Sequence, residues 1–311
     1  MSSIGHSLNI GTRGSLLALW QADKAIDSLH QIAPDQNCTV VKITTSGDIN
    51  QQGSLADIGG KGLFSKEIDR ALLAGEIDCA VHSLKDLETT LPEGIVLAAV
   101  LPRDDARDAF LGQTLESLPK GANVGTCSVR RAAQVLKQRP DLSIVPMRGN
   151  VQTRLKKLQS GQADATLLSY AGLQRLGLES EAAEVFATDT MTPAVGQGVI
   201  AICVRAEDTA LRDVLHGIND DTTLYATTAE RALLAELDGS CHTPIGGYAT
   251  LEADKLKLSA ILLSPDGRRS YAHQDSITWD ASANLQTARA LGVQVASVIK
   301  QRASAILAES Q

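Results

Sequence analysis

Short apolar runs alternate with amphipathic segments along the first two thirds of the chain. β-Branched or continuously apolar runs predict strands at 7–12, 38–45, 77–82 and 94–102. Helices are predicted at 16–32, which Pro34 follows as a stop signal, and at 63–76, where apolar residues recur at helical spacing. This alternation is typical of an α/β fold with parallel strands.

The same strand–loop–helix pattern continues between two weak boundaries, at 101–108 and 188–198. An apolar strand at 199–205 then resembles the strands of the first segment. We therefore expect the chain to leave a first lobe near residue 101 and to re-enter it near residue 197, so that two crossing segments form a hinge. The predicted division is lobe 1 at 1–101 and 197–218, lobe 2 at 104–192, and a C-terminal domain at 220–311.

The C-terminal segment has a different pattern. A helix is predicted to end at Gly239, and three β segments joined by short turns follow between residues 244 and 276. A long amphipathic helix is predicted at 283–308. These elements indicate a small α+β domain with a three-stranded antiparallel sheet.

A glycine-rich polar stretch at 46–62 has no core-forming pattern. Long loops in compact domains are usually functional or mobile, so we expect a mobile loop with a functional role here.

Composition narrows the class of protein. The 311 residues are 43% hydrophobic and 21% charged, as in an ordinary soluble protein. No stretch is long and apolar enough to span a membrane, and the N-terminus lacks a signal-peptide pattern, so a cytoplasmic protein is expected. The net charge of −7 disfavours nucleic acid as a partner. Five scattered cysteines argue against a disulfide framework and a structural metal site.

Arginines gather where predicted strands end and helices begin. Ligands of open α/β sheets bind at the carboxyl ends of strands, and the arginine fork matches carboxylate or phosphate. Any single arginine is more simply explained as a solvated surface residue. Six such positions in an acidic chain nevertheless favour a cleft for several anionic groups: Arg13, Arg130, Arg131, Arg148, Arg154 and Arg175. Small polar neighbours at the same places are Ser15, Thr126 and Ser128.

Lys85 and Asp86 follow the predicted strand at 77–82. A carboxylate there can stabilise a cationic intermediate or move protons, and a structural Lys–Asp pair is an equally good explanation. His82, within the strand, is expected to be a hydrogen-bonded core residue rather than a base.

Cys241 lies in the turn-forming stretch "DGSCHTPIGG" next to His242. Adjacent side chains point apart, and no further ligands have metal spacing, so a metal site is disfavoured. A protease-like nucleophile, a covalently attached cofactor and a plain loop cysteine all remain open from the residues alone.

Motifs along the whole chain resemble those of the porphobilinogen deaminase family. They include "TRGSLLALWQ" (12–21), "GGKGLFSKEID" (59–69), "AVHSLKD" (80–86), "RDDARDAF" (103–110), "VGTCSVRR" (124–131), "RGNVQTRLKKL" (148–158), "PAVGQG" (193–198) and "ERALLAELDGSCHTPIGGYA" (230–249). The last is similar to the family's cofactor-attachment motif. Leu16, Cys127 and His242 depart from the family's usual residues, but none is an arginine or the attachment cysteine.

The resemblance implies two lobes like those of periplasmic binding proteins and a third domain that carries a dipyrromethane cofactor on Cys241. It implies head-to-tail condensation of four porphobilinogen molecules with loss of ammonia, and then hydrolytic release of hydroxymethylbilane. It also implies a monomer whose product passes to uroporphyrinogen-III synthase.

By motif, Asp86 is the expected catalytic carboxylate, stabilising positive charge on pyrrole nitrogens. The expected cofactor-binding residues, besides Cys241, are Lys85, Ser83, Thr126, Ser128, Arg130, Arg131 and Arg148. The expected substrate-binding residues are Arg13, Ser15, Arg148, Arg154, Arg175, Gln197, Lys61 and Phe64.

Two rival hypotheses accompany this one. A two-lobed anion-binding protein without catalysis would use the same cleft. A Cys–His hydrolase would use Cys241 as a nucleophile.

Overall fold

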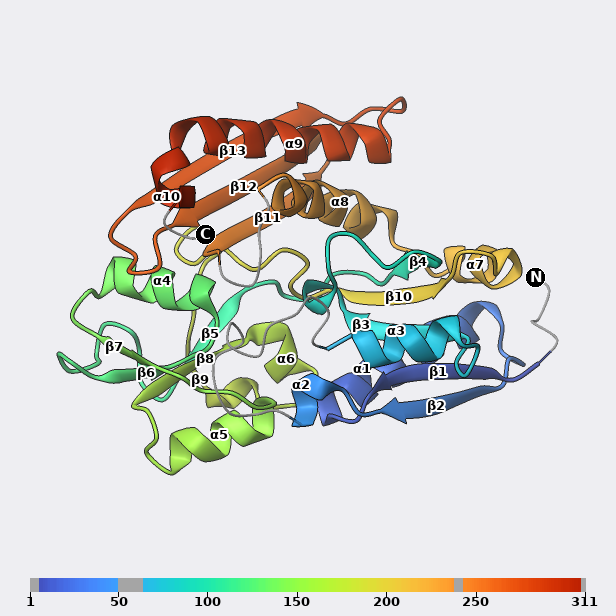
Figure 1. Ribbon diagram of the computed structural model, residues 1–311, viewed down its shortest axis with the longest axis horizontal. Coiled ribbons are helices and arrows are strands. Elements are labelled where there is room, and N and C mark those ends of the chain that lie inside the picture. The colour runs from blue at the N-terminus through green and yellow to red at the C-terminus, as the bar shows by residue number, and fades with distance from the viewer. Residues whose placement is uncertain (1–5, 50–63, 238–242, 309–311) are drawn as a thin grey trace. The chain divides into compact units, whose positions relative to one another are not determined.

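The computed structural model describes residues 6–49, 64–237 and 243–308, which form two compact units (Figure 1). Among these residues, the first unit comprises 6–49, 64–104 and 198–224, and the second comprises the rest. The C-terminal segment groups with residues 105–197, so its division from lobe 2 as a separate domain stays a prediction.

The first unit is an α/β layer around one mixed sheet. Its strand order is β2-β1-β3-β10-β4, with β1 parallel to β2 and β3, and β10 antiparallel to β3 and β4. Its elements are β1 (Leu8–Arg13), α1 (Leu16–Ile32), β2 (Cys38–Ile43), α2 (Ser46–Ile49), α3 (Lys66–Leu73), β3 (Cys79–Ser83), the 3₁₀ turn η1 (Leu84–Asp86), β4 (Ile95–Val100), β10 (Ile200–Arg205) and α7 (Thr209–His216). The antiparallel β10 departs from the expected parallel sheet because it comes from the re-entering segment, without a βαβ crossover.

Side chains of alternate residues of β3 pack on the two opposite faces of this sheet. Cys79 and Val81 pack in the core cluster that contains Leu29 of α1. Ala80 packs in the cluster that contains Leu72 of α3. The helices on the two faces therefore hold the strand in place, and its carboxyl end carries the SLKD stretch.

The expected loop at 46–62 begins instead with the one-turn helix α2, because the chain folds back on Thr45. The backbone N–H groups of Asp48 and Ile49 donate to the carbonyl of Thr45, and the Asp48 carboxylate accepts from the Thr45 hydroxyl at 2.8 Å. Residues 50–62 lie outside the described ranges.

The second unit contains another five-stranded mixed sheet, of order β7-β6-β8-β5-β9. β6 is parallel to β7 and β8, whereas β5 is antiparallel to β8 and β9. The sequence pattern does not predict β5 and β9, which follow polar or helical stretches. The elements are β5 (Asp108–Leu111), β6 (Asn123–Gly125), α4 (Val129–Gln138), β7 (Ser143–Val145), α5 (Val151–Gln159), β8 (Ala165–Ser169), α6 (Tyr170–Gln174), η2 (Glu179–Glu181) and β9 (Ala182–Val185).

The C-terminal segment forms the expected antiparallel sheet, of order β11-β12-β13. Its elements are β11 (Ile245–Glu252), β12 (Lys255–Leu263), β13 (Ser270–Thr278), α9 (Leu285–Arg302) and α10 (Ser304–Ala308), and α8 (Asp221–Glu236) leads into it from the first unit. The predicted helix at 283–308 is interrupted at Ala303. A Cβ on Gly292 of α9 would lie 2.2 Å from the carbonyl oxygen of Ala229, so glycine permits α9 to approach α8 closely.

These sheets confirm the α/β fold class with a small three-stranded antiparallel sheet at the C-terminal end. Within the described residues, no helix has the length and apolar character that a membrane span requires.

Candidate active site

A polar pocket lies at the carboxyl ends of β1 and β3 in the first unit. Five of the residues that the sequence places in the site line it together: Arg13, Ser15, Phe64, Ser83 and Asp86. The two parallel strands end at the same edge of the sheet, so residues about 70 positions apart in the chain meet there.

Arg13 is the last residue of β1, and its guanidinium is already engaged. Its Nε lies 3.2 Å from Oδ1 and 3.3 Å from Oδ2 of Asp48, and its carbon Cζ lies 4.3 Å from the centre of the Phe64 ring. Burial acts to raise the pKa of Asp48, but hydrogen bonds from Arg13 and Thr45 outweigh it and hold that pKa below its ordinary value. The predicted arginine thus has an internal carboxylate partner, which sequence reasoning missed.

The serines of the pocket are held by local structure. Ser15 caps the N-terminus of α1, where its Oγ accepts a hydrogen bond from the Ala18 N–H at 3.2 Å. The Ser83 hydroxyl accepts from Nε2 of Gln21, on the same helix, at 2.8 Å. Both contacts fix the edge of the pocket against α1.

Asp86 ends the 3₁₀ turn that continues β3, and its side chain is exposed at the pocket. The neighbouring Lys85 is half-buried. A 3₁₀ turn directly after a buried strand presents a carboxylate on a rigid support, as a group that stabilises developing charge requires.

His82 differs from its expectation as a hydrogen-bonded core residue. It is 6% exposed in β3, but its Nε2 atom is buried and has no hydrogen-bond partner in the part of the chain that the structure describes. Burial, and secondarily the charge of Arg13, lower its pKa to about 4. His82 is therefore a neutral imidazole at neutral pH, in the lining of the same pocket as Asp86.

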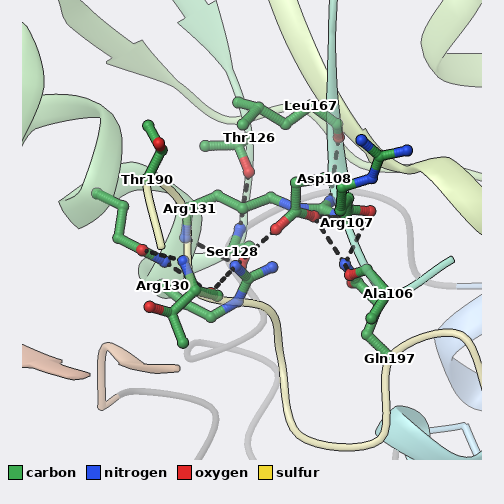
Figure 2. A network of polar contacts seen from close by, with 12 residues as sticks. Ala106, Arg107, Asp108, Thr126, Ser128, Arg130, Arg131, Leu167, Thr190 and Gln197 are labelled. Carbon is green, nitrogen blue, oxygen red and sulfur yellow. Dashed lines mark hydrogen bonds and ion pairs between the residues drawn. The ribbon is translucent and has the colours of Figure 1, made fainter. Parts of the chain in front are cut away.

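The second unit contains a buried polar network centred on Asp108, the first residue of β5 (Figure 2). Arg130 donates through Nη1 to Oδ2 of Asp108 at 2.7 Å and to the Thr192 carbonyl at 2.8 Å. Arg131 donates through Nε and Nη2 to Oδ1, at 2.9 and 2.7 Å. Burial acts to raise the pKa of Asp108, but the two arginines outweigh it and hold that pKa far below its ordinary value.

In this network two guanidinium groups bind one buried carboxylate. Gln197 joins it, donating from Nε2 to the Ala106 carbonyl at 2.7 Å and to Oδ1 of Asp108 at 3.1 Å. Asp108 was missed as a functional residue, although it lies within the "RDDARDAF" motif. The contacts of Gln197 give it a structural role, and its contact with substrate stays a prediction.

The turn between β6 and α4 orients the two arginines. Ser128 caps α4 by accepting from the Arg131 N–H at 3.4 Å, and Thr126 accepts from the Ser128 N–H at 3.1 Å. The expected cofactor contacts Thr126 and Ser128 therefore lie at a helix N-terminus, which favours anions.

Arg148 follows β7 and is 7% exposed. Its Nη1 is buried and has no hydrogen-bond partner among the described residues. Arg154 donates from Nε to the Gly149 carbonyl at 3.0 Å in the same turn, and Arg175, at the end of α6, is buried. A buried guanidinium nitrogen of this kind is a donor that a bound carboxylate would satisfy, so Arg148 fits a carboxylate-bearing cofactor.

Cys241 and Lys61 lie outside the described residues, so their predicted roles stay predictions. In the described ranges, Cys38, Cys79, Cys127 and Cys203 are free thiols. Those ranges also contain no group of three or more His, Cys, Asp or Glu residues placed to hold a metal ion.

The structure is an α/β protein in which arginines gather at strand ends and helix starts, as the sequence predicts. Residues 8–213 match the family model described as the dipyrromethane cofactor binding domain of porphobilinogen deaminase, and residues 224–301 match that enzyme's C-terminal domain. The chain belongs to the porphobilinogen deaminase family.

Relatives named porphobilinogen deaminase match most of the chain. That of Nitrobacter hamburgensis is 50% identical over 300 residues, covering 94% of this chain and 93% of the relative. That of Paracoccus denitrificans is 47% identical, covering 96% of each. The chloroplastic protein of Oryza sativa is 47% identical, covering 85% of this chain and 76% of the relative.

Among solved structures, a periplasmic binding protein of Salmonella typhimurium with high arginine specificity is 12% identical. It aligns with a TM-score of 0.40, covering 70% of this chain and 94% of that one.

Proposed function

We propose that the chain is a hydroxymethylbilane synthase, which condenses four porphobilinogen molecules head to tail with loss of ammonia and releases linear hydroxymethylbilane by hydrolysis. The observation that carries this proposal is the pocket that brings Asp86 together with Arg13 at the ends of β1 and β3. Family membership supports this reaction. The pocket contains a carboxylate, Asp86, and a guanidinium, Arg13, which the reaction requires.

Asp86 is the proposed catalytic carboxylate. When ammonia leaves a bound substrate pyrrole, positive charge develops on the ring, and a fixed carboxylate beside the ring nitrogen stabilises that charge. Arg13, Arg154 and Arg175 are proposed to bind the carboxylates of substrate pyrroles, with Ser15, Phe64, Lys61 and Gln197 as further contacts. Each pyrrole carries two carboxylates, so repeated additions require several arginine forks.

A dipyrromethane cofactor on Cys241 would supply the carbon nucleophile that starts the chain. Arg148 is the proposed anchor for one of its carboxylates, because its buried Nη1 needs an acceptor. Arg130 and Arg131, which both bind Asp108, are proposed as further contacts of the cofactor. The other proposed contacts are Lys85, Ser83, Thr126 and Ser128.

Turnover of porphobilinogen by the purified chain tests the proposal, with release of ammonia and of a linear tetrapyrrole as readouts. Asp86→Asn, which removes the charge at nearly constant shape, is expected to reduce turnover at least about 100-fold. Asp213→Asn, at an exposed carboxylate of α7, is the matched control and should leave turnover unchanged. Near-normal turnover in Asp86→Asn would refute the role of Asp86, and a wild-type chain that binds but never consumes porphobilinogen would support the binding-protein rival.

A cytoplasmic location, a monomeric state and transfer of the product to uroporphyrinogen-III synthase stay predictions that accompany this proposal.

A further inference from the structure

Gln134 of α4 is a buried glutamine whose amide binds the backbone of a residue distant in the chain. It is 2% exposed, its Nε2 donates to the Thr192 carbonyl at 3.0 Å, and its Oε1 accepts from the Thr192 N–H at 2.8 Å. An amide that pairs with both polar groups of one residue fixes the backbone there, as a hydrogen-bonded residue of a neighbouring strand does. Thr192 is therefore held in a defined place against α4.

Arg130 binds the same carbonyl oxygen as Gln134. Its Nη1 donates to Oδ2 of Asp108 at 2.7 Å (Figure 2) and to the Thr192 carbonyl at 2.8 Å. The two side chains lie on one face of α4, because residues at positions i and i+4 of a helix are neighbours. Within the described ranges both hydrogen bonds of this guanidinium leave from Nη1, so the edge formed by Nε and Nη2 remains for a carboxylate. Gln134 thus fixes an acceptor that orients this edge.

The backbone next to Thr192 binds the C-terminal sheet. The Pro193 carbonyl accepts a hydrogen bond from the N–H of Gly247, in β11, at 3.0 Å. β11 follows Cys241 in the sequence. Thr192 and Pro193 therefore link α4, which carries Arg130, to the strand that follows the proposed cofactor anchor.

We propose that Gln134 is a positioning residue for the cofactor: by holding Thr192, it places Arg130 where a carboxylate of a dipyrromethane on Cys241 reaches its guanidinium. This inference rests on the proposed function, in which Arg130 contacts the cofactor. In this role Gln134 acts through Arg130 without touching the cofactor. Without the amide the Thr192 carbonyl is free to shift, and Asp108 is the one acceptor that still orients Arg130.

The rate at which the chain acquires its cofactor tests this role without requiring turnover. The chain is purified from cells that make no porphobilinogen and mixed with porphobilinogen, and its intact mass over time gives the rate at which two pyrrole units are added. Gln134→Met removes the amide at nearly constant volume. Gln36→Met is the matched control, because Gln36 is 4% exposed and its amide also donates to backbone carbonyls, those of His6 and Asn37 in the first unit.

Gln134→Met is expected to gain the two pyrrole units at least about tenfold more slowly than the wild type, because a misplacement of about 1 Å can cost about 100-fold in rate. Gln36→Met should gain them at the wild-type rate. Arg130→Lys separates positioning from a general loss of stability, since lysine retains the charge beside Asp108 but lacks the planar fork. Because Gln134 acts through Arg130, adding Gln134→Met to Arg130→Lys should change the rate by less than about twofold.

A second variant covers poor folding of Gln134→Met. Gln134→Glu retains an acceptor for the Thr192 N–H but loses the donor to the Thr192 carbonyl, and it should slow the gain of mass to a similar extent. Circular dichroism identifies the variants that fold.

A wild-type rate in folded Gln134→Met or Gln134→Glu would overturn this inference and leave the proposed function intact. Equal slowing by Gln134→Met in the wild-type and Arg130→Lys backgrounds would also overturn it, because Gln134 would then act independently of Arg130. Failure of both Gln134 variants to fold would overturn it too, by making the amide a requirement of the fold itself. A wild-type chain that never gains the two pyrrole units would instead overturn the proposed function.

Discussion

The carboxylate of Asp48 accepts hydrogen bonds from the guanidinium of Arg13, whose Nε lies 3.2 Å from Oδ1 and 3.3 Å from Oδ2. Arg13 is the residue proposed to bind a carboxylate of the substrate. An internal carboxylate therefore already occupies one edge of the fork, and it neutralises the charge that an incoming carboxylate would meet.

Replacing Asp48 by asparagine tests this competition. The amide retains a hydrogen-bond acceptor for Arg13 but removes the negative charge, so the arginine attracts substrate more strongly. We expect KM for porphobilinogen to fall by up to about fivefold, because partly exposed ion pairs contribute up to about 1 kcal/mol. Steady-state kinetics measures it, and a raised KM would show that Asp48 positions Arg13 instead of competing for it.

Asp108→Asn is expected to destabilise the second unit strongly. The carboxylate is completely buried between Arg130 and Arg131, and removing one partner of a buried ion pair typically costs about 3–5 kcal/mol. The free energy of unfolding in urea measures the loss. Asp141→Asn, which removes the partner of Arg139 in a partly exposed pair, should change that free energy less. Equal effects of the two substitutions would contradict the structural importance of the network.

The buried Nη1 of Arg148 predicts a difference between the cofactor-free and the loaded protein. This donor has no hydrogen-bond partner among the described residues, so Arg148→Gln should not reduce the stability of a protein prepared without the cofactor. Attachment of the cofactor should raise the free energy of unfolding by about 1.5–3 kcal/mol less in Arg148→Gln than in the wild type. That difference is the usual contribution of a hydrogen bond to a charged group.

Thermal unfolding of both forms tests the prediction for Arg148. Arg139→Gln, at an arginine already paired with Asp141, should change both forms equally. If the cofactor stabilises Arg148→Gln as much as it stabilises the wild type, the proposed contact is contradicted.

His82 predicts a dependence of stability on pH. Its folded pKa of about 4 lies below the ordinary value of 6.5, so between these values the unfolded chain binds a proton that the folded chain does not. Stability is therefore lost as the pH falls from about 6.5 to about 4, by up to roughly 3 kcal/mol from this residue. The difference in unfolding free energy between wild type and His82→Phe should narrow or reverse over that range. A difference independent of pH would contradict the neutral buried imidazole.

Sequence patterns predicted the elements that hydrophobic periodicity controls. The helix at 16–32 and the three C-terminal strands appear where expected. The helix and the strand β12 each have one largely apolar buried face. β5 was not predictable in this way, because it is a four-residue strand whose first residue is a buried aspartate. Its place in the sheet depends on partners distant in the chain, Arg130 and Arg131.

The site residues also differ in how far the sequence predicts them. Strand ends predicted that Arg13 and Asp86 would lie at one edge of a sheet, and the pocket contains both. Asp48 and His82 were not predicted as parts of the site. Their roles depend on which side chains they face after folding, and neither the "SGD" turn nor a histidine in an apolar strand indicates this.

We propose above that this enzyme builds its product on a dipyrromethane cofactor covalently attached to Cys241. The intact mass of the purified chain tests it most directly. We expect the mass of the sequence plus two pyrrole units for the wild-type chain, and the mass of the sequence alone for Cys241→Ala. A wild-type chain with the mass of the sequence alone, from cells supplied with porphobilinogen, would contradict it.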